Sequence, residues 1–185
     1  MIREHHVRKV LVGERRIAAR VRKLAAEISR DHPEDPIVII GILRGSFVFL
    51  ADLVRALRRR GRRAVIDFMT LRSYGAGTRS SGRVRLAKGF SADVRGRRVL
   101  LVDDILDTGR TAEFARRYLL RRGAAGVRIC ALLDKPARRT RRIAADYVGF
   151  TVPDVFVVGY GLDYAGFHRD LSSIAEVTFT DSIRD

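Results

Sequence analysis

The feature that most constrains the fold is an alternation of short apolar runs with longer segments of helical periodicity. The apolar runs are rich in β-branched residues and lie at 36–43, 63–73, 97–104, 126–134 and 154–162. A short continuous apolar run indicates a strand buried on both faces. Strands that alternate with helices predict an α/β fold, with a parallel sheet covered by helices on both faces. Such sheets bind ligands at the carboxyl ends of their strands.

Three segments between these runs are predicted to be amphipathic helices. Residues 13–32 place Ile17, Val21, Leu24 and Ile28 at spacings of four, three and four, which is the period of a helix face. Residues 46–61 repeat Phe47, Leu50, Val54 and Leu57 in the same way, and Gly61 stands where a C-terminal cap is expected. A third helix is expected from about Arg110 to Arg122, ending at Gly123.

Composition narrows the class of protein. A chain of 185 residues, 46% hydrophobic and 31% charged, suits one globular domain, and no apolar run is long enough to span a membrane. The lone Cys130 is expected in the core, which favours a reducing, cytoplasmic location. Lys and Arg exceed Asp and Glu by 37 to 21, a net charge of +16. Because nearly all the excess is arginine spread along helices, a compositional bias is favoured over a nucleic-acid surface.

The stretch VLLVDDILDTGRTA, residues 99–112, is the strongest functional signal. Its last part is expected to turn from a strand into a helix, where unpaired backbone N–H groups and the helix dipole favour a phosphate. Asp103 and Asp104 precede this turn, where they could accept hydrogen bonds from sugar hydroxyls or hold Mg²⁺. Helix capping would explain Asp107 or Thr108 but leaves the adjacent acid pair without a role.

This stretch resembles the phosphoribosyl diphosphate (PRPP) signature of type I phosphoribosyltransferases. Four further segments resemble the hypoxanthine-guanine branch of that family: GILRGSFVFLADL its pyrophosphate loop, LRSYGAG the start of its mobile lid, LLDKPARR its base-reading lysine, and VPDVFVVGYGLDYAGFHRDL its purine-binding hood. The resemblance implies one domain over 1–185, with a mainly parallel core over about 37–150. A hood from about 1–15 and 151–185 and a lid over about 73–83 complete it.

The resemblance also implies the reaction and its residues. PRPP would donate its 5-phosphoribosyl group to N9 of hypoxanthine or guanine, with Mg²⁺ as cofactor and pyrophosphate as the leaving group. Asp107 would exchange a proton with N7 of the purine. The ribose and 5′-phosphate would be bound by Asp103, Asp104, Asp107, Thr108, Gly109, Arg110 and Thr111, and the pyrophosphate by Arg44, Gly45 and Arg169. Many relatives have Glu where Asp103 stands. A cis peptide bond, reported for this family, is expected between Leu43 and Arg44.

The purine would be read by residues of the later segments. By resemblance, Lys135 would reach O6, Phe156 would stack on the base, and the backbone of Val157 would read its N1 or N2 edge. Asp163 would approach a second Mg²⁺, and Asp103 and Asp104 are the other metal candidates. Ser73 and Tyr74 would work in the lid. Plainer interpretations remain: a surface lysine, a core phenylalanine, and a structural ion pair involving Asp163 or Arg169.

Several alternatives stay open. A preference for xanthine or guanine would keep the same fold and chemistry. A PRPP-sensing, nucleic-acid-binding regulator would fit the charge, but regulators of this type typically lack an acid at the position of Asp107. A plain α/β domain with an incidental phosphate nest would show no turnover. Relatives are commonly dimers or tetramers, so a homodimer or homotetramer is expected, with no membrane or nucleic-acid partner.

Overall fold

A six-stranded sheet lies at the centre of the computed structural model, which describes residues 4–33, 35–74 and 83–179. The strand order is β4-β3-β2-β5-β6-β7. Only β4 runs antiparallel to its neighbour, so the expected mainly parallel sheet is confirmed. The strands are β2 (Ile37–Leu43), β3 (Ala64–Tyr74), β4 (Arg83–Lys88), β5 (Arg98–Leu106), β6 (Gly126–Asp134) and β7 (Tyr147–Thr151).

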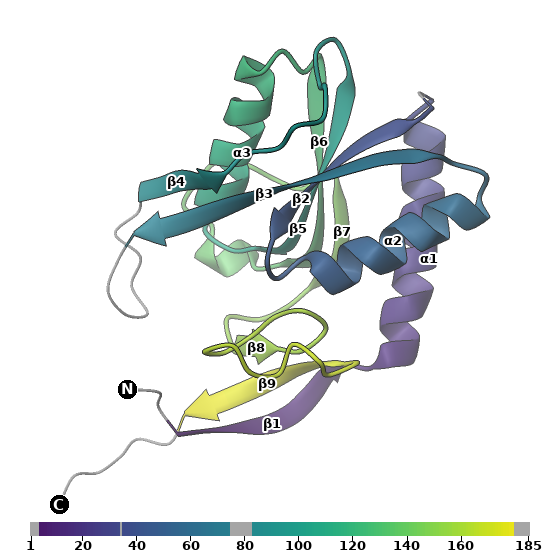
Figure 1. The fold of residues 1–185 in the computed structure, drawn as a ribbon. Coiled ribbons are helices and arrows are strands. Elements are labelled where there is room, and N and C mark those ends of the chain that lie inside the picture. Colours follow the sequence, from purple (N-terminus) through teal and green to yellow (C-terminus); the bar gives the residue numbers. More distant parts are fainter. Residues whose placement is uncertain (1–3, 34, 75–82, 180–185) are drawn as a thin grey trace, which may run out of the picture.

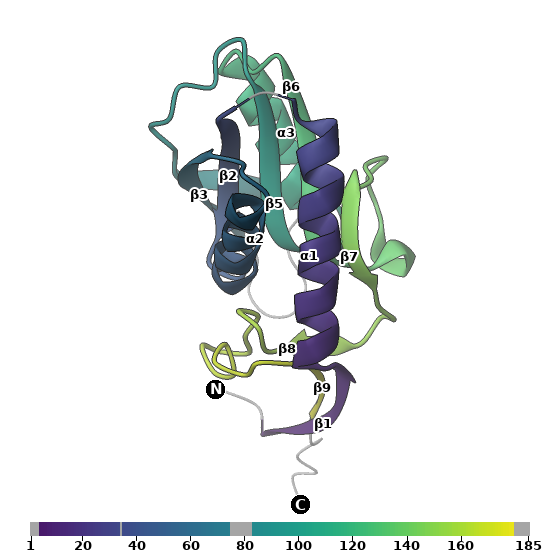
Figure 2. The ribbon, with the colours of Figure 1, turned by 90° about the vertical axis from the view of Figure 1, so that its right-hand side faces the viewer.

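Helices cover both faces of this sheet (Figures 1 and 2). α1 (Glu14–Asp31) and α2 (Phe47–Arg59) pack on one face, and α3 (Arg110–Arg121) packs on the other. The face predicted for α1 is confirmed, since Ile17, Val21, Leu24 and Ile28 are all buried. Gly123 follows the end of α3 with a φ of 92°, a left-handed conformation that glycine adopts without strain.

The buried face of α2 differs from the prediction. Leu50 and Leu57 are buried, but Phe47 is 46% exposed and Val54 is only partly buried. The helix instead buries Phe49, Leu50, Leu53, Ala56 and Leu57. Both sets of apolar residues have helical spacing, so the spacing alone does not decide which set faces the sheet. The direction in which the chain enters α2 from β2 decides this. Phe47, the first helical residue, is turned away from the core as a result.

Burial within the sheet explains the apolar runs. All of β2 except its last residue is buried, as expected for a central strand with helices on both faces. Cys130 on β6 is also buried, which confirms its predicted place in the core, and burial raises the pKa of its thiol. No helix in the described part of the chain is both long and apolar enough to cross a membrane.

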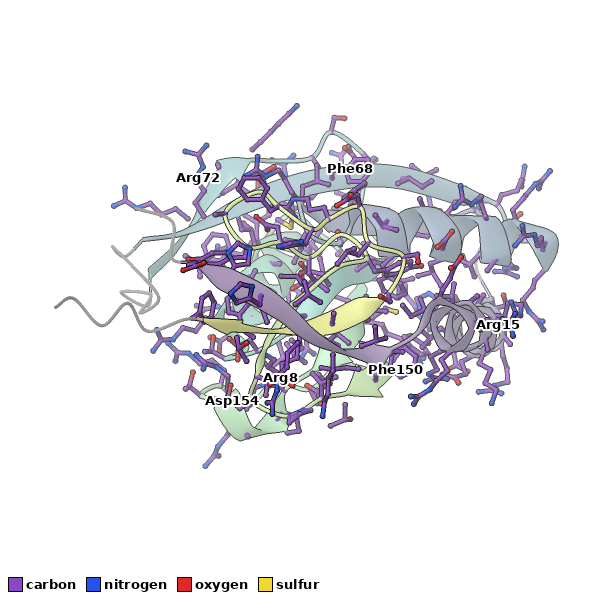
Figure 3. The ribbon with its side chains drawn as sticks, turned by 90° about the horizontal axis from the view of Figure 1, so that it is seen from below. Arg8, Arg15, Phe68, Arg72, Phe150 and Asp154 are labelled. Carbon is purple, nitrogen blue, oxygen red and sulfur yellow. The ribbon has the colours of Figure 1, made fainter. Side chains whose placement is uncertain are left out.

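A second, three-stranded sheet contains strands from both ends of the chain. β1 (His5–Val12), β9 (Ile174–Phe179) and β8 (Phe156–Val158) form an antiparallel sheet in the order β1-β9-β8. This small sheet lies below the main one in Figure 1. Seen from below, Arg8 of β1 lies on the same side of the molecule as Asp154, opposite Phe68 of β3 (Figure 3).

The apolar run at 154–162 was wrongly predicted to be a strand of the parallel sheet. Only three of its residues form a strand, β8, and these pair antiparallel with β9 in the small sheet. Gly159 and Gly161 follow with φ values of 95° and 100°. These left-handed residues bend the chain, so the run cannot continue as one extended strand.

Candidate active site

A cavity of about 600 Å³ opens at the carboxyl ends of β2 and β5. It brings together residues from the loop after β2, the end of β5 and the first turn of α3. The position agrees with the rule that parallel sheets bind ligands at this edge. Among its lining residues are all the expected PRPP-binding residues and two of the three expected pyrophosphate-binding ones: Arg44, Gly45, Asp103, Asp104, Asp107, Thr108, Gly109, Arg110 and Thr111.

The two adjacent aspartates belong to β5 itself, because the strand continues to Leu106. Asp103 is buried, and its Oδ1 accepts a hydrogen bond of 3.1 Å from the backbone N–H of Asp104. Burial, and then the charge of Asp104, raises the pKa of Asp103 well above its usual value. Burial also raises the pKa of Asp104, although local hydrogen bonds and the charge of Arg169 oppose this. The pair therefore lacks enough positive charge around it to stabilise two anions.

Asp104 lies directly against the loop after β2. A Cβ atom on Gly45 would stand 1.5 Å from Oδ2 of Asp104, so only glycine fits there while the carboxylate keeps its position. Gly161, from the loop after β8, also lies close to Gly45, since a Cβ on Gly161 would stand 2.3 Å from the Gly45 carbonyl oxygen. Three separate parts of the chain thus meet at the backbone of Gly45.

The turn into α3 has the form expected of an anion-binding nest. Gly109 is the N-cap of α3 and has a φ of 84°. The residues of this turn and of the first helical turn line the cavity, and a helix leaves its first backbone N–H groups without partners inside the helix. The Thr108 hydroxyl lies 3.5 Å from the backbone nitrogen of Arg110. Residues 107–111 could therefore hold a phosphate through backbone N–H groups and two threonine hydroxyls.

Two consecutive arginines hold Asp107 in the cavity wall. Nε of Arg138 lies 2.8 Å from Oδ1 of the Asp107 carboxylate. Arg139 binds the backbone instead, donating to the carbonyl oxygens of Asp107 at 2.8 Å and Leu106 at 2.9 Å. The sequence interpretation used only the lysine of the segment 132–139 and missed both arginines. Their signal was their position in a segment already assigned to the site.

The loop between β2 and α2 carries Arg44 and Gly45. The peptide bond between Leu43 and Arg44 is cis, which confirms the expectation for this bond. Ser46 occupies the N-cap position of α2, but its hydroxyl donates to the carbonyl oxygen of Ile42 at 2.6 Å and makes no cap. The Arg44 side chain is exposed.

The expected purine-binding residues do not line this cavity but cluster beside it. Lys135 is buried, and its Nζ donates a 2.5 Å hydrogen bond to the carbonyl oxygen of Val155. Burial lowers the pKa of Lys135, against the opposing effect of the Asp107 charge. Phe156 is 38% exposed and packs edge-to-face with Tyr164. Lys135 is therefore not a free surface lysine, and Phe156 is not a buried core residue.

Asp163 and Arg169 form an ion pair in the loop between β8 and β9. Nη2 of Arg169 lies 2.5 Å from Oδ1 of Asp163, and Nη1 donates to the carbonyl oxygen of Gly161 at 2.6 Å. The other Asp163 oxygen accepts a hydrogen bond from the backbone N–H of Gly166. The ion pair that the sequence left open as an alternative is thus present.

Ser73 and Tyr74 are the last residues of β3. Most of the expected lid, residues 75–82, lies outside the described residues. Val84 of β4, just after this gap, lines the cavity. The strands on either side of the expected lid therefore lead to and from the site.

Comparison with known proteins assigns the family. Residues 11–165 match the phosphoribosyl transferase domain. The chain is 44% identical to a hypoxanthine phosphoribosyltransferase of Haemophilus influenzae, covering 97% of this chain and all of that one. It is 46% identical to a hypoxanthine-guanine phosphoribosyltransferase of Aquifex aeolicus, covering 90% and 92%. A hypoxanthine-guanine phosphoribosyltransferase structure from Bacillus anthracis superposes with a TM-score of 0.85 at 37% identity, covering 95% and 99%. The chain belongs to the phosphoribosyltransferase family.

Proposed function

We propose that this enzyme transfers the 5-phosphoribosyl group of PRPP to N9 of hypoxanthine and guanine, as a step of purine salvage. The products are IMP or GMP and pyrophosphate. The observation that carries the proposal is one cavity with two carboxylates at the end of β5, a third directly after it, and an anion nest at the start of α3. The names of the relatives from H. influenzae and A. aeolicus support hypoxanthine and guanine as substrates.

PRPP would span the cavity from the nest to the loop after β2. Thr108, Gly109, Arg110 and Thr111 would bind the 5′-phosphate, while Asp103 and Asp104 would accept hydrogen bonds from the ribose hydroxyls. Backbone groups of Arg44 and Gly45 would bind the pyrophosphate. Arg169 would join them there, as its charge already acts on Asp104. Both elements line the same cavity, which suits a ligand with phosphate groups at both ends.

The reaction replaces the C1′–O bond to pyrophosphate with a bond from C1′ to N9 of the purine. Positive charge develops on the ribose ring as the pyrophosphate departs, and nearby carboxylates stabilise it. Asp107 would face N7 and exchange a proton with it while the new bond forms. Arg138 and Arg139 fix the side chain and the backbone of Asp107, so this group is held in place before the purine arrives.

The purine would lie between the cavity and the small sheet, which we propose is the hood. Lys135 uses one N–H for Val155 and has two more, one of which would donate to O6. Phe156 is exposed enough to stack on the base, and the backbone of Val157 would read the N1 or N2 edge. Ser73 and Tyr74 would begin the lid that excludes water from the cationic transition state.

The donor set suits Mg²⁺ bound together with PRPP. Mg²⁺ commonly takes one or two protein carboxylates and completes its shell with phosphate oxygens and water. Asp103 and Asp104 offer such carboxylates, and their raised pKa values mark a place where a cation is favoured. Asp163 would approach a second Mg²⁺, although its carboxylate already binds Arg169. The metal would neutralise charge on the leaving pyrophosphate.

Assembly and location belong to the same proposal. A single domain over 1–185 is proposed, with the core, hood and lid in the bounds given above. We expect a homodimer or homotetramer, and Ile66 and Phe68 of β3 are large apolar side chains exposed on the protomer. A cytoplasmic location suits the free thiol of Cys130.

Direct assay tests the proposal. The protein is incubated with PRPP, Mg²⁺ and, separately, hypoxanthine, guanine, xanthine and adenine, and nucleotide formation is followed. We expect turnover with hypoxanthine and guanine, little with adenine, and loss of most turnover in Asp107→Asn. Absence of PRPP-dependent turnover with every base would refute the function. An Asp107→Asn variant as fast as the parent would refute the role of Asp107 alone.

A further inference from the structure

Arg138 connects two carboxylates that come from different parts of the chain. Its Nε lies 2.8 Å from Oδ1 of Asp107, in the loop after β5, and its Nη1 lies 3.3 Å from Oδ1 of Asp154. Arg138 itself ends a short 3₁₀ helix, η1 (Pro136–Arg138), which begins directly after Lys135. The nearby charge of Asp107 is the largest cause of the raised pKa of Arg138.

This ion pair is not needed to fix the backbone of Asp107. Arg139, whose side chain is only 16% exposed, already binds the carbonyl oxygens of Leu106 and Asp107 and forms an ion pair with Asp134. The Arg138 side chain is 43% exposed. Exposed ion pairs contribute roughly 0–1 kcal/mol to stability, so stability alone is a weak reason for this arrangement. The two neighbouring arginines therefore have separate tasks.

Resting on the proposed function, we infer that Arg138 is a positioning residue for Asp107. The guanidinium contacts the carboxylate at Oδ1, and the other oxygen, Oδ2, would face N7 of the purine. It also places a positive charge 2.8 Å from the carboxylate. Arg138 lines the cavity next to Asp107, so it acts from within the site.

Asp154 provides the second anchor. It lies at the periphery of the molecule in Figure 3, with 51% of its side chain exposed, in the turn that leads into β8. A guanidinium bound at two points has fewer orientations than one bound at a single carboxylate, so its position relative to Asp107 is better defined. Because β8 carries Phe156 and Val157, the same arginine links the proton-exchanging group to the strand that would bind the base.

A double-mutant cycle tests this inference. Four proteins are compared: the parent, Arg138→Met, Asp107→Asn, and the variant with both changes. We expect Arg138→Met to lower kcat/KM for hypoxanthine about tenfold and to change KM for PRPP by less than twofold. In the Asp107→Asn background, the same change should alter kcat/KM by less than twofold, because there is no longer a carboxylate to position. A purely structural role would give the same loss in both backgrounds.

Two further variants sharpen the result. Arg138→Lys keeps a cation but loses the planar fork, so it should recover part of the loss. Arg142→Met removes another exposed arginine of the same segment and should leave kcat/KM unchanged. Should Arg138→Met fold poorly, as judged by its melting temperature, Arg138→Gln carries the same expectation.

The outcomes separate the inference from the proposed function. Equal losses in the two backgrounds, or an Arg138→Met variant with the kcat/KM of the parent, would overturn the role of Arg138 and leave the proposed function standing. A parent protein that forms no nucleotide from PRPP and any purine would instead remove the proposed function, and with it this inference.

Discussion

The meeting of three chain segments at Gly45 predicts that Gly161→Ala damages both stability and substrate binding. Gly161 has a φ of 100°, and an added Cβ would stand 2.3 Å from the Gly45 carbonyl oxygen. Its own carbonyl accepts a hydrogen bond from Arg169, so the loop cannot retreat without moving a residue proposed to bind pyrophosphate. Gly45 is itself in close contact with Asp104, which leaves its backbone little room to move.

The size of the effect follows from two costs. A left-handed conformation costs a residue with a Cβ roughly 1–2 kcal/mol. Overpacking against a rigid neighbour costs roughly 1–3 kcal/mol more. The sum, roughly 2–5 kcal/mol, corresponds to a fall in melting temperature of roughly 4–20 °C for a protein of this size, at roughly 2–4 °C per kcal/mol. We also expect KM for PRPP to rise severalfold, because the shift reaches the loop that we propose binds pyrophosphate.

Gly166→Ala is the matched control. Gly166 lies in the same loop with a φ of 92°, but an added Cβ there would have no neighbour within 4 Å. The Gly166→Ala variant should lose only the conformational part of the stability, roughly 1–2 kcal/mol, and its KM for PRPP should equal that of the parent. Thermal denaturation and steady-state kinetics on both variants give the comparison. Equal melting temperatures and equal KM values for the two variants would show that the contact with Gly45 is not tight.

Three other changes test separate parts of the structure. Lys135→Ala should raise KM for hypoxanthine about tenfold or more, through loss of a charged hydrogen bond, and KM for PRPP less; the reverse order would contradict the purine role. Gly149→Ala places a Cβ 2.2 Å from the Leu132 carbonyl oxygen, so the free energy of unfolding measured in urea should fall by roughly 1–3 kcal/mol. Gly126→Ala, where the added Cβ has only a 4.0 Å contact, should change this free energy little. Burial raises the pKa of Asp67, but hydrogen bonds from Phe68, Ala92 and Ser91 lower it below its usual value. The folded pKa is thus below the unfolded one, so this stabilisation is complete above about pH 4 and is lost as the pH falls further. Asp67→Asn should therefore lower the free energy of unfolding by roughly 1–3 kcal/mol at pH 7, and this free energy should fall less steeply with acid than in the parent. An unchanged dependence of the free energy of unfolding on pH would refute this.

The central strands and two of the helices could be predicted because burial dominates their composition. β2 is a continuous apolar run, β5 contains the apolar run at 99–102, and the spacing in α1 indicates one buried face. β1 and β4 are not continuous apolar runs: β1 mixes basic residues and valines on its exposed positions, and β4 is an edge strand in which arginine alternates with apolar residues. β1 also pairs with β9, at the other end of the chain, and local periodicity does not contain such a partner.

Some contacts of the candidate site could likewise be predicted from the sequence, and others could not. Asp103 to Thr111 are close in sequence, and the turn chemistry that joins them is local, so their grouping could be predicted. The contacts of Lys135 with Val155, of Arg138 with Asp107 and of Asp163 with Arg169 depend on how loops are arranged in space. Motif resemblance indicated which residues matter, but only the fold shows which partner each of them binds.

The pairing of β1 with β9 sets an order in which the molecule can be built. His5 lies opposite Phe179, so β1 cannot complete its pairing with β9 until nearly the whole chain has been synthesised. The main sheet has no such constraint, since β2 to β7 follow one another closely enough to assemble as they are synthesised. The edge of the main sheet that lines the cavity can thus form before residues 174–179 are synthesised, whereas the small sheet forms last.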